Sequence, residues 1–492
     1  MTKLKGVIAA AGKGLRLNPF TDLIPKVLLS IDGNPILKLN IELMRDALGI
    51  KEIYVLVGYK KENIISAFGD GSALGVAIKY VPVEHAEEGF AAGLLCMKEH
   101  ISETFCLILG DEVYHNSNHR EMVKLLDREF SAVCAVKEEA NPRIIKHNYA
   151  VQIQDGFITS LVEKPEAVQN NYLGCGTFLL KPEIFEHIKA TPVSPRTKRV
   201  EFIDVINSIA QRKSDVLPFM LTGEYSNVNN IDDFNTANYL LRSANFNTKT
   251  VSLIIPAYNE ESSLGSVIDD FKGKVNEIIV VNNNSKDNTA KIAAEKGARV
   301  LSGNFKGYGD ALKFGMDNAA GDILILTEAD GSFLAKDTGK ILEYLKDADM
   351  VLGTRTTSQM IEQGANMSFL LRLGNILAAK FIELLWLRKH EPRLTDVGCT
   401  YRGIWKSAYN EIRGLLKGAG PEFSPEMIIA AMRYNKRIIE IPVTYSGRIS
   451  GESKFSGTLF ASLRTALRML WLIITRKIYD IIDKLNIWKL YR

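Results

Sequence analysis

Two segments of this sequence begin alike, with a short apolar run that leads into small and polar residues. One is Lys5–Gly12 (KGVIAAAG), and the other is Thr250–Ala257 (TVSLIIPA), near the middle of the 492-residue chain. After each of them, short β-branched runs alternate with amphipathic helical patterns. Continuous apolar strands separated by helices are typical of parallel sheets that are covered on both faces. The repeated start therefore predicts two α/β domains, each built on a mainly parallel sheet.

The join between the two domains is expected at residues 242–250 (RSANFNTKT), which are polar and follow no helical or strand period. Beyond residue 458, apolar residues recur at spacings of three and four, which predicts a helix. We therefore expect domains at 1–242 and 250–458, followed by an amphipathic helical tail at 459–492.

The composition excludes several classes of protein. The five cysteines are irregularly spaced and form no CxxC pair, which argues against a disulfide framework or a structural zinc site and favours a reducing compartment. The apolar run Val7–Ala11 is too short for a secretory signal, and no apolar segment reaches the ~20 residues that a membrane-spanning helix needs. The net charge of +4 is too small to indicate nucleic-acid binding. A cytoplasmic protein is expected.

A loop rich in glycine and basic residues follows the first apolar run, at Gly12–Thr21 (GKGLRLNPFT). Gly12 and Gly14 would let backbone amides come close to a triphosphate, and Arg16 would neutralise part of its charge. Taken alone, the loop is explained equally well as a tight turn between a strand and a helix.

Four later motifs favour the phosphate site. They are Pro25–Leu28 (PKVL), Gly110–Asp111 (GD), Glu163–Pro165 (EKP) and Gly174–Thr177 (GCGT). Asp111 follows an apolar strand, at the sheet edge where α/β proteins hold ligands and where Mg²⁺ would find a carboxylate. In this order, and over about residues 3–241, the motifs resemble those of the sugar-1-phosphate nucleotidyltransferases, the sugar-nucleotide pyrophosphorylases.

The resemblance implies that an NTP and a sugar-1-phosphate react to give an NDP-sugar and pyrophosphate, a reaction that depends on charge neutralisation and positioning. Arg16 and Lys26 would be catalytic, with Lys26 bridging the two reacting phosphates. Asp111 would hold Mg²⁺ or Mn²⁺, and Asn229 stands where the family has a second metal-binding aspartate. The other binding residues that the resemblance implies are Gly12, Gly14, Gly89 in the base-reading loop, Glu163, Lys164 and Gly176.

The second half carries another ordered set of motifs. They are PAYNE at 256–260, VVNNNSKD at 280–287, TEADGS at 327–332, GTR at 353–355, DVGCTYR at 396–402 and RISGESK at 448–454. Over about residues 250–457 the set resembles the family 2 glycosyltransferases, most closely the dolichol-phosphate mannose and glucose synthases. Together, the two resemblances imply two nucleotide-binding Rossmann-like domains of the GT-A type.

An acidic pair in this half, Glu328 and Asp330, can bind a divalent ion that bridges a donor diphosphate and stabilises it as it leaves. Glu328 departs from the family's aspartate by one methylene. The resemblance places Asp396 near the acceptor as a general base, although a phosphate acceptor is already ionised and needs a base less. The donor would contact Pro256, Tyr258, Glu260 and Asn282, of which Asn282 replaces the usual aspartate. The cations suited to phosphate-bearing ligands are Arg355, Arg402, Arg448 and Lys454.

The tail is basic, with seven Lys/Arg against two Asp over residues 461–492, and it carries Trp471 and Trp488. A basic amphipathic helix of this kind indicates binding to an anionic membrane surface. The alternatives are packing on the second domain and formation of a homo-oligomer.

The sequence therefore predicts a bifunctional enzyme whose partners are an NTP, a sugar-1-phosphate, the NDP-sugar and a polyprenyl phosphate at the inner face of the membrane. A soluble saccharide or alcohol acceptor is one alternative, and a non-catalytic nucleotide-binding module is another. Residues 1–245 contain 27 Lys/Arg and 30 Asp/Glu, whereas the remainder contains 34 and 27, so the small net charge averages an acidic half and a basic one.

Overall fold

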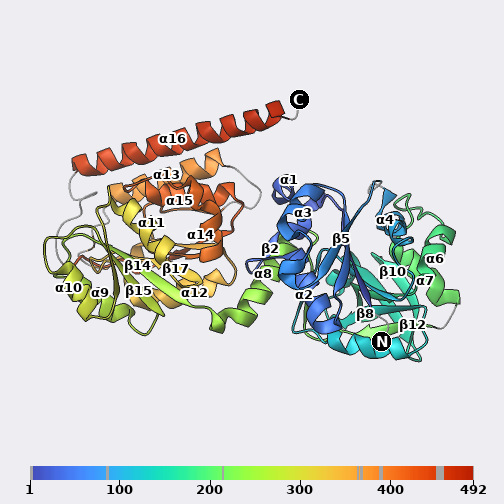
Figure 1. Ribbon diagram of the computed structural model, residues 1–492. Helices are drawn as coiled ribbons and strands as arrows, with labels where there is room; N and C mark the ends of the chain where they lie inside the picture. Colours follow the sequence, from blue (N-terminus) through green and yellow to red (C-terminus); the bar gives the residue numbers. More distant parts are fainter. Residues whose placement is uncertain are drawn as a thin grey trace. The chain divides into compact units, whose positions relative to one another are not determined.

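The structure is a computed structural model that describes residues 4–84, 88–212, 215–362, 365, 369–386, 392–449 and 459–490. The chain divides into two compact units, Met1–Leu241 and Arg242–Arg492. Each unit is an α/β domain with a mixed, mainly parallel sheet, which confirms the predicted fold class (Figure 1).

The first unit is built on a nine-stranded sheet. Its strands are β1 (Lys5–Ala10), β4 (Glu52–Val57), β5 (Ala77–Pro82), β6 (Phe105–Leu109), β8 (Ala132–Glu138), β9 (Tyr149–Gln154), β10 (Phe157–Glu163), β11 (Tyr172–Leu180) and β12 (Val216–Met220). Strands β6, β1, β4 and β5 are parallel neighbours, whereas β11 is antiparallel to β6. The carboxyl ends of β1 and β6 therefore meet at one edge of the sheet.

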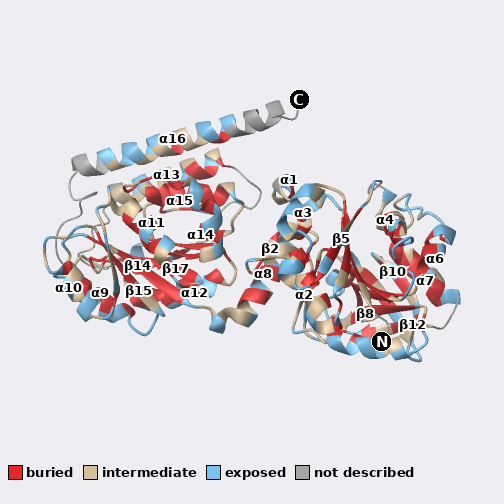
Figure 2. Cartoon of the chain, viewed as in Figure 1, coloured by how far each residue is buried: buried red, intermediate tan, exposed pale blue. Residues whose placement is uncertain are grey.

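Successive side chains of β1 pack into hydrophobic cores on opposite faces of the sheet. Val7 packs in a cluster with α7 (Phe202–Arg212), and the next residue, Ile8, packs in a cluster with α2 (Ile36–Leu48) on the opposite face. Because helices cover both faces, both residues are buried and the strand is apolar after Lys5. Figure 2 shows in red how much of the strands in the two units is buried. The remaining helices of this unit are α1 (Phe20–Leu23), α3 (Lys61–Phe68), α4 (Phe90–Leu94), α5 (Pro142–His147) and α6 (Ile184–Ala190).

Two short ribbons accompany the sheet. Strand β7 (Glu112–His115) continues from β6 and pairs with β13 (Glu224–Asn227), while β2 (Ser30–Ile31) pairs with β3 (Asn34–Pro35). The β7–β13 ribbon matters for the site, because it joins the end of β6 to a segment far along the chain.

The join between the units differs from the prediction, because α8 (Ile231–Asn245) extends into residues expected to be irregular. Arg242 is buried, donates to the carbonyl of Ala348 at 3.0 Å and to Asp349 at 2.6 Å, and stacks on the Trp405 ring. These contacts within the second unit explain why a polar segment without an apolar period stays helical.

The second unit has a seven-stranded sheet in the order β16-β15-β14-β17-β19-β18-β20, with only β19 antiparallel to its neighbours. The strands are β14 (Val251–Ala257), β15 (Glu277–Asn282), β16 (Arg299–Ser302), β17 (Ile323–Leu326), β18 (Met350–Thr354), β19 (Arg402–Trp405) and β20 (Ile438–Pro442). The helices are α9 (Leu264–Phe271), α10 (Thr289–Glu295), α11 (Tyr308–Asn318), α12 (Thr338–Leu345), α13 (Phe369–Leu385), α14 (Lys406–Ile412), α15 (Phe423–Arg433) and α16 (Leu459–Leu490).

The last helix, α16, lies against α13 and α15 (Figure 1). Ile473 is fully buried in the core of the unit, and Arg476 forms an ion pair with Glu426 of α15. Within the described residues, no helix combines the length and the apolar character that crossing a membrane requires.

Candidate functional site

The candidate site of the first unit lies where β1 and β6 end. Lys26 Nζ is 2.5 Å from Asp111 Oδ2, and both side chains are mostly buried. Asp111 reaches this position because Gly110 lies directly against β1, where its N–H donates to the Ala9 carbonyl at 2.9 Å. A Cβ at Gly110 would come within 2.1 Å of that carbonyl oxygen, so only glycine fits.

Two more predicted residues join this cluster. Arg16 Nη2 donates to Asn229 Oδ1 at 3.1 Å, and the Val228 N–H donates to the Asp111 carbonyl at 3.0 Å. The β7–β13 ribbon therefore brings together Arg16 and Asn229, which lie 213 positions apart in the sequence. The cluster pairs two cations with one carboxylate and one amide oxygen.

The other predicted residues of this unit lie around the cluster. Gly14 has φ 64°, a left-handed conformation that favours glycine and lets its carbonyl accept a bond from the Thr21 hydroxyl. Gly12 has open space beside it, and Gly89 precedes α4. Glu163 is the last residue of β10 and Lys164 follows it, and β9 and β11 separate this strand from β6. Within the described residues, the structure gives no contact between them and the Lys26–Asp111 pair.

One polar residue of this region escaped prediction. Glu112 is fully buried and accepts a bond from Asn227 Nδ2 at 2.9 Å, and burial, followed by the charge of Asp111, raises its pKa to about 8. A Cβ on Gly176 would lie 2.4 Å from Glu112 Oε1. The family resemblance implies that Gly176 contacts substrate. The structure shows a separate packing reason for glycine at this position, because any side chain would clash with Glu112. The only signal for this in the sequence is a second acidic residue directly after Asp111.

In the second unit, the acidic pair follows β17. Arg448 Nη2 lies 3.0 Å from Asp330 Oδ2 and 3.7 Å from Glu328 Oε2. The Thr400 hydroxyl donates to Glu328 Oε1 at 2.7 Å, which gives the longer side chain a fixed partner. Burial, followed by the charge of Asp330, raises the pKa of Glu328 to about 7. Three predicted residues are thus in direct contact, with one cation facing two carboxylates.

The predicted donor-binding residues end the neighbouring strands β14 and β15. Ala257 pairs with Asn282 in the sheet, so Tyr258 and Asn282 lie at the same carboxyl edge as the residues that follow β17. Pro256 opposes Val281 in the same ladder. Asn282 is nearly buried, and its Oδ1 accepts a bond from the N–H of Ser285 at 3.2 Å. The N–H of Glu260 donates to Thr289 Oγ1 at 2.8 Å, which ties the PAYNE segment to α10.

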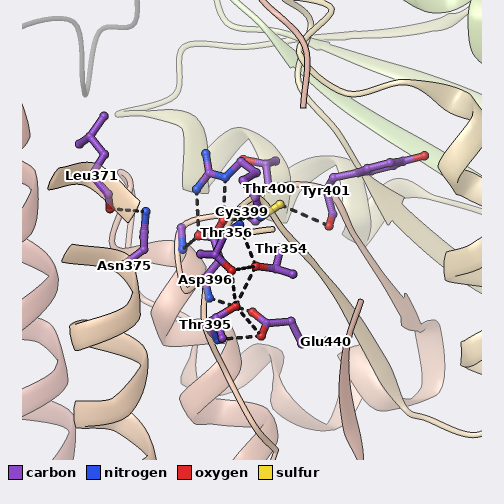
Figure 3. Close-up of polar contacts among 12 residues, drawn as sticks. Thr354, Thr356, Leu371, Asn375, Thr395, Asp396, Cys399, Thr400, Tyr401 and Glu440 are labelled. Carbon is purple, nitrogen blue, oxygen red and sulfur yellow. Dashed lines mark hydrogen bonds and ion pairs between the residues drawn. The ribbon is translucent and has the colours of Figure 1, made fainter. Parts of the chain in front are cut away.

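Asp396 lies on the loop that precedes β19, where it forms a closed ion pair with Arg355 (Figure 3). Arg355 Nε and Nη2 donate to its two oxygens at 2.8 and 2.9 Å. The N–H groups of Arg355 and Gly398 add bonds of 3.1 and 3.0 Å. Despite burial, the charge and hydrogen bonds of Arg355 hold the pKa of Asp396 below its usual value. The carboxylate is therefore ionised and saturated with donors.

Arg402 differs from what its motif suggests. It is 1% exposed, and its guanidinium donates to the carbonyls of Cys399 and Ser424 at 3.1 and 3.0 Å, so it supports the loop from inside the domain. Burial lowers its pKa. The side chains of Arg355 and Arg448 are 14% and 25% exposed and are therefore more accessible than that of Arg402. Lys454, the last predicted cation, lies outside the described residues.

Comparison with known proteins matches the two units to two different families. Residues 5–244 match the family model of nucleotidyl transferases, and residues 252–412 match that of glycosyl transferase family 2. The UTP–glucose-1-phosphate uridylyltransferase AglF of Haloferax volcanii is 36% identical over 37% of this chain and 74% of its own length. The low-salt glycan biosynthesis hexosyltransferase Agl6 of the same organism is 29% identical over 40% of this chain and 48% of its own.

A further relative is covered over nearly its whole length. An uncharacterized glycosyltransferase of Mycobacterium bovis is 30% identical over 46% of this chain and 98% of its own length. The chain thus belongs to the nucleotidyl transferases over residues 5–244 and to glycosyl transferase family 2 over residues 252–412, and it joins sugar-nucleotide synthesis to glycosyl transfer in one polypeptide.

Proposed function

We propose that the enzyme makes an NDP-sugar in a domain at 1–242 and that a domain at 250–458 transfers the sugar to a polyprenyl phosphate at the cytoplasmic membrane surface. The names of the relatives suggest UTP and glucose-1-phosphate as the first substrates to test. The single observation that carries the acceptor proposal is the closed Asp396–Arg355 pair.

In the first unit, Arg16 and Lys26 neutralise the phosphates of the NTP and hold them in line with the sugar phosphate. The open space beside Gly12 leaves room for a phosphate close to the backbone amides. Glu163 and Lys164 orient the sugar phosphate, and Gly89 belongs to the loop that faces the base. Asp111 and Asn229 supply the oxygen atoms, one charged and one neutral, for a divalent ion.

In the second unit the acidic pair offers oxygen ligands for Mg²⁺ or Mn²⁺, and in the first unit Asp111 and Asn229 would supply them. Burial, followed by the charge of Asp330, raises the pKa of Glu328, and a cation beside the two carboxylates would counter both effects. Oxygen ligands of this type suit both ions. The ion would supply charge stabilisation to the departing diphosphate. Pro256, Tyr258, Glu260 and Asn282 would hold the nucleoside.

The proposal of a phosphate acceptor rests on the ionised and fully hydrogen-bonded carboxylate of Asp396. A general base needs a free lone pair and a pKa near the working pH, whereas Asp396 is buried, accepts bonds on both oxygens and has a lowered pKa. An alcohol would require such a base. A phosphate monoester is already ionised at neutral pH and can attack the anomeric carbon unaided, while Arg355 provides a planar cation that matches its oxygens.

The acceptor is tested by offering undecaprenyl phosphate and undecaprenol, in the same detergent, to the full chain with UTP, ¹⁴C-labelled glucose-1-phosphate and Mn²⁺, with the other common NTPs in parallel. We expect the label to enter the lipid phosphate at least about 10²-fold faster than the alcohol, because Asp396 already accepts hydrogen bonds on both oxygens and is a poor base for an alcohol. Equal transfer to undecaprenol, or label only in a soluble saccharide, would show that the acceptor assignment is wrong.

The membrane contact is supported by the way α16 packs. At 100° per residue, the buried side of α16 passes through Ile473 and Asp480, and the opposite side is apolar and exposed. Arg464 and Arg468 lie along one margin of this apolar stripe. Arg464 is exposed, and Arg468 forms an ion pair with Glu422 at 3.3 Å but keeps about half of its side chain exposed, so both leave cationic surface beside the stripe for lipid headgroups. The exposed stripe consists of Leu467, Leu470, Trp471, Ile474, Ile478, Ile481 and Ile482.

We expect the full chain to co-sediment with vesicles of phosphatidylcholine and phosphatidylglycerol more strongly than with phosphatidylcholine alone, since the margin of the stripe is cationic. Replacing Trp471 and Ile478 together with serine should weaken binding about tenfold, because both side chains are exposed apolar area. The control replaces Val193 and Ile65, which are also exposed, with serine and should bind as the wild type does. If both pairs of substitutions weaken binding equally, α16 is not the membrane contact.

A further inference from the structure

Glu440 is a carboxylate in the middle of the apolar strand β20 (IIEIP). Within the described part of the chain, no lysine or arginine forms an ion pair with it. All three of its hydrogen bonds come instead from the loop that carries Asp396 (Figure 3). Oε2 accepts from the N–H and the hydroxyl of Thr395 at 2.7 and 3.0 Å, and Oε1 accepts from the N–H of Asp396 at 2.8 Å.

The position of Glu440 carries a cost for the fold alone. Glu440 is half-buried on the edge strand β20, where a carboxylate without a cationic partner loses part of its hydration, and burial raises its pKa to about 7. An apolar residue would continue the strand at a lower cost. The three bonds therefore have to be explained by what they hold in place.

They hold the backbone from which Asp396 projects. The Thr395 hydroxyl, which Glu440 binds, also bonds to Thr354 at 2.8 Å and Thr356 at 2.7 Å, on either side of Arg355. Asp396 in turn receives the guanidinium of Arg355 through two bonds. A continuous chain of contacts thus leads from Glu440 through the Asp396 backbone to the Arg355 guanidinium.

We infer that Glu440 is a positioning residue of the transfer site, which acts through Asp396 to fix the Arg355 guanidinium. The inference rests on the proposed function in one respect, because it assumes that Arg355 meets a phosphate-bearing ligand. Glu440 itself touches no substrate. It accepts both backbone amides at once, which only a group with two acceptor oxygens can do.

The test uses Glu440→Gln in the full chain. Glutamine has the same shape, but in either orientation its NH₂ group faces one of the two backbone N–H groups. We expect the peptide covering residues 394–400 to exchange its amide hydrogens about tenfold faster, while the rest of the domain is unchanged. The matched control is Glu277→Gln, because Glu277 also accepts a backbone N–H, that of Ala320, but lies at the start of β15.

The route through Asp396 is tested by a double-mutant cycle on transfer from UDP-glucose to undecaprenyl phosphate. Glu440→Gln should lower kcat/KM about tenfold in the wild-type background but less than about twofold in Asp396→Asn, since the contact on which it acts is then already lost. Glu277→Gln should stay near the wild-type rate in both backgrounds.

The outcomes distinguish the positioning role of Glu440 from the proposed function of the loop that carries Asp396. Unchanged exchange over residues 394–400 in Glu440→Gln, or losses that simply multiply in the double variant, would overturn the role of Glu440. Full activity of Asp396→Asn, or no transfer by the wild type, would instead overturn the proposed function of the loop, and the exchange measurement would still decide whether Glu440 holds it.

Discussion

Replacing Lys26 with alanine is expected to lower the release of pyrophosphate from an NTP and a sugar-1-phosphate by about 10²- to 10³-fold. Lys26 Nζ lies 2.5 Å from Asp111 in a site that is mostly shielded from solvent. A cation in such a place stabilises developing charge far more than it would in water, because the local dielectric is low. Its loss leaves two groups of like charge, the Asp111 carboxylate and the substrate phosphates, without a bridge.

The measurement follows pyrophosphate release and, on the same protein, transfer from ready-made UDP-glucose. Transfer should remain within about twofold of the wild-type rate, because the second unit has its own core. The control is Lys79→Ala, which removes an exposed lysine of the same unit that pairs with Glu52 at 2.8 Å. A folded Lys26→Ala protein that releases pyrophosphate at the wild-type rate would contradict the assignment of the first site.

The strands were the most predictable part of the fold. Val7 and Ile8 pack on opposite faces of a sheet that helices cover on both sides, so burial makes the whole strand apolar and easy to find. The end of α8, residues 242–245, was not predictable, for the opposite reason. Arg242 is held by Asp349 and Trp405, residues more than 100 positions away, and no local period indicates such contacts.

The candidate site also has a part that the sequence predicts and a part that it does not. Motif order led to Lys26 and Asp111 and to Glu328 and Asp330, and the structure places each pair together. It did not reveal what surrounds them. Whether a motif cation faces a ligand or supports a loop depends on burial, and Arg402 has the same charge in the sequence as Arg448 but contacts only carbonyls.

Residues that act by positioning other residues are the hardest to predict from the sequence. Glu112 and Glu440 each place one carboxylate among apolar residues, and their partners are backbone N–H, amide and hydroxyl groups that are common in any sequence. Only the fold shows which residues they hold. An acid that is withdrawn from solvent and has no ion-pair partner is thus a useful feature to look for once a structure is available.

Replacing Asp330 with asparagine should abolish glycosyl transfer, with a loss of at least about 10³-fold, and leave pyrophosphate release within about twofold of the wild-type rate. Asp330 and Glu328 form the acidic pair, and asparagine keeps the size of the side chain while removing one of the two negative charges. The bond from the Ser332 N–H to Oδ1, 2.9 Å in the wild type, can persist with an amide oxygen. The substitution removes the negative charge and, with it, the ion pair between Oδ2 and Arg448 Nη2, which is 3.0 Å long in the wild type.

A second readout separates this loss from unfolding. The substitution removes the Asp330 charge, which after burial is the second cause of the raised pKa of Glu328, but it also breaks the ion pair with Arg448. Because these two effects oppose each other, the free energy of unfolding should change by no more than about 1 kcal/mol. Binding of Mn²⁺ alone, followed by its electron paramagnetic resonance signal, should lose one site per chain. The control is Asp317→Asn, which removes a charge that pairs with Arg413 at the end of α11. If Asp330→Asn binds as much Mn²⁺ as the control does and still transfers sugar, the acidic pair does not hold the metal and the donor diphosphate must be neutralised by the arginines alone.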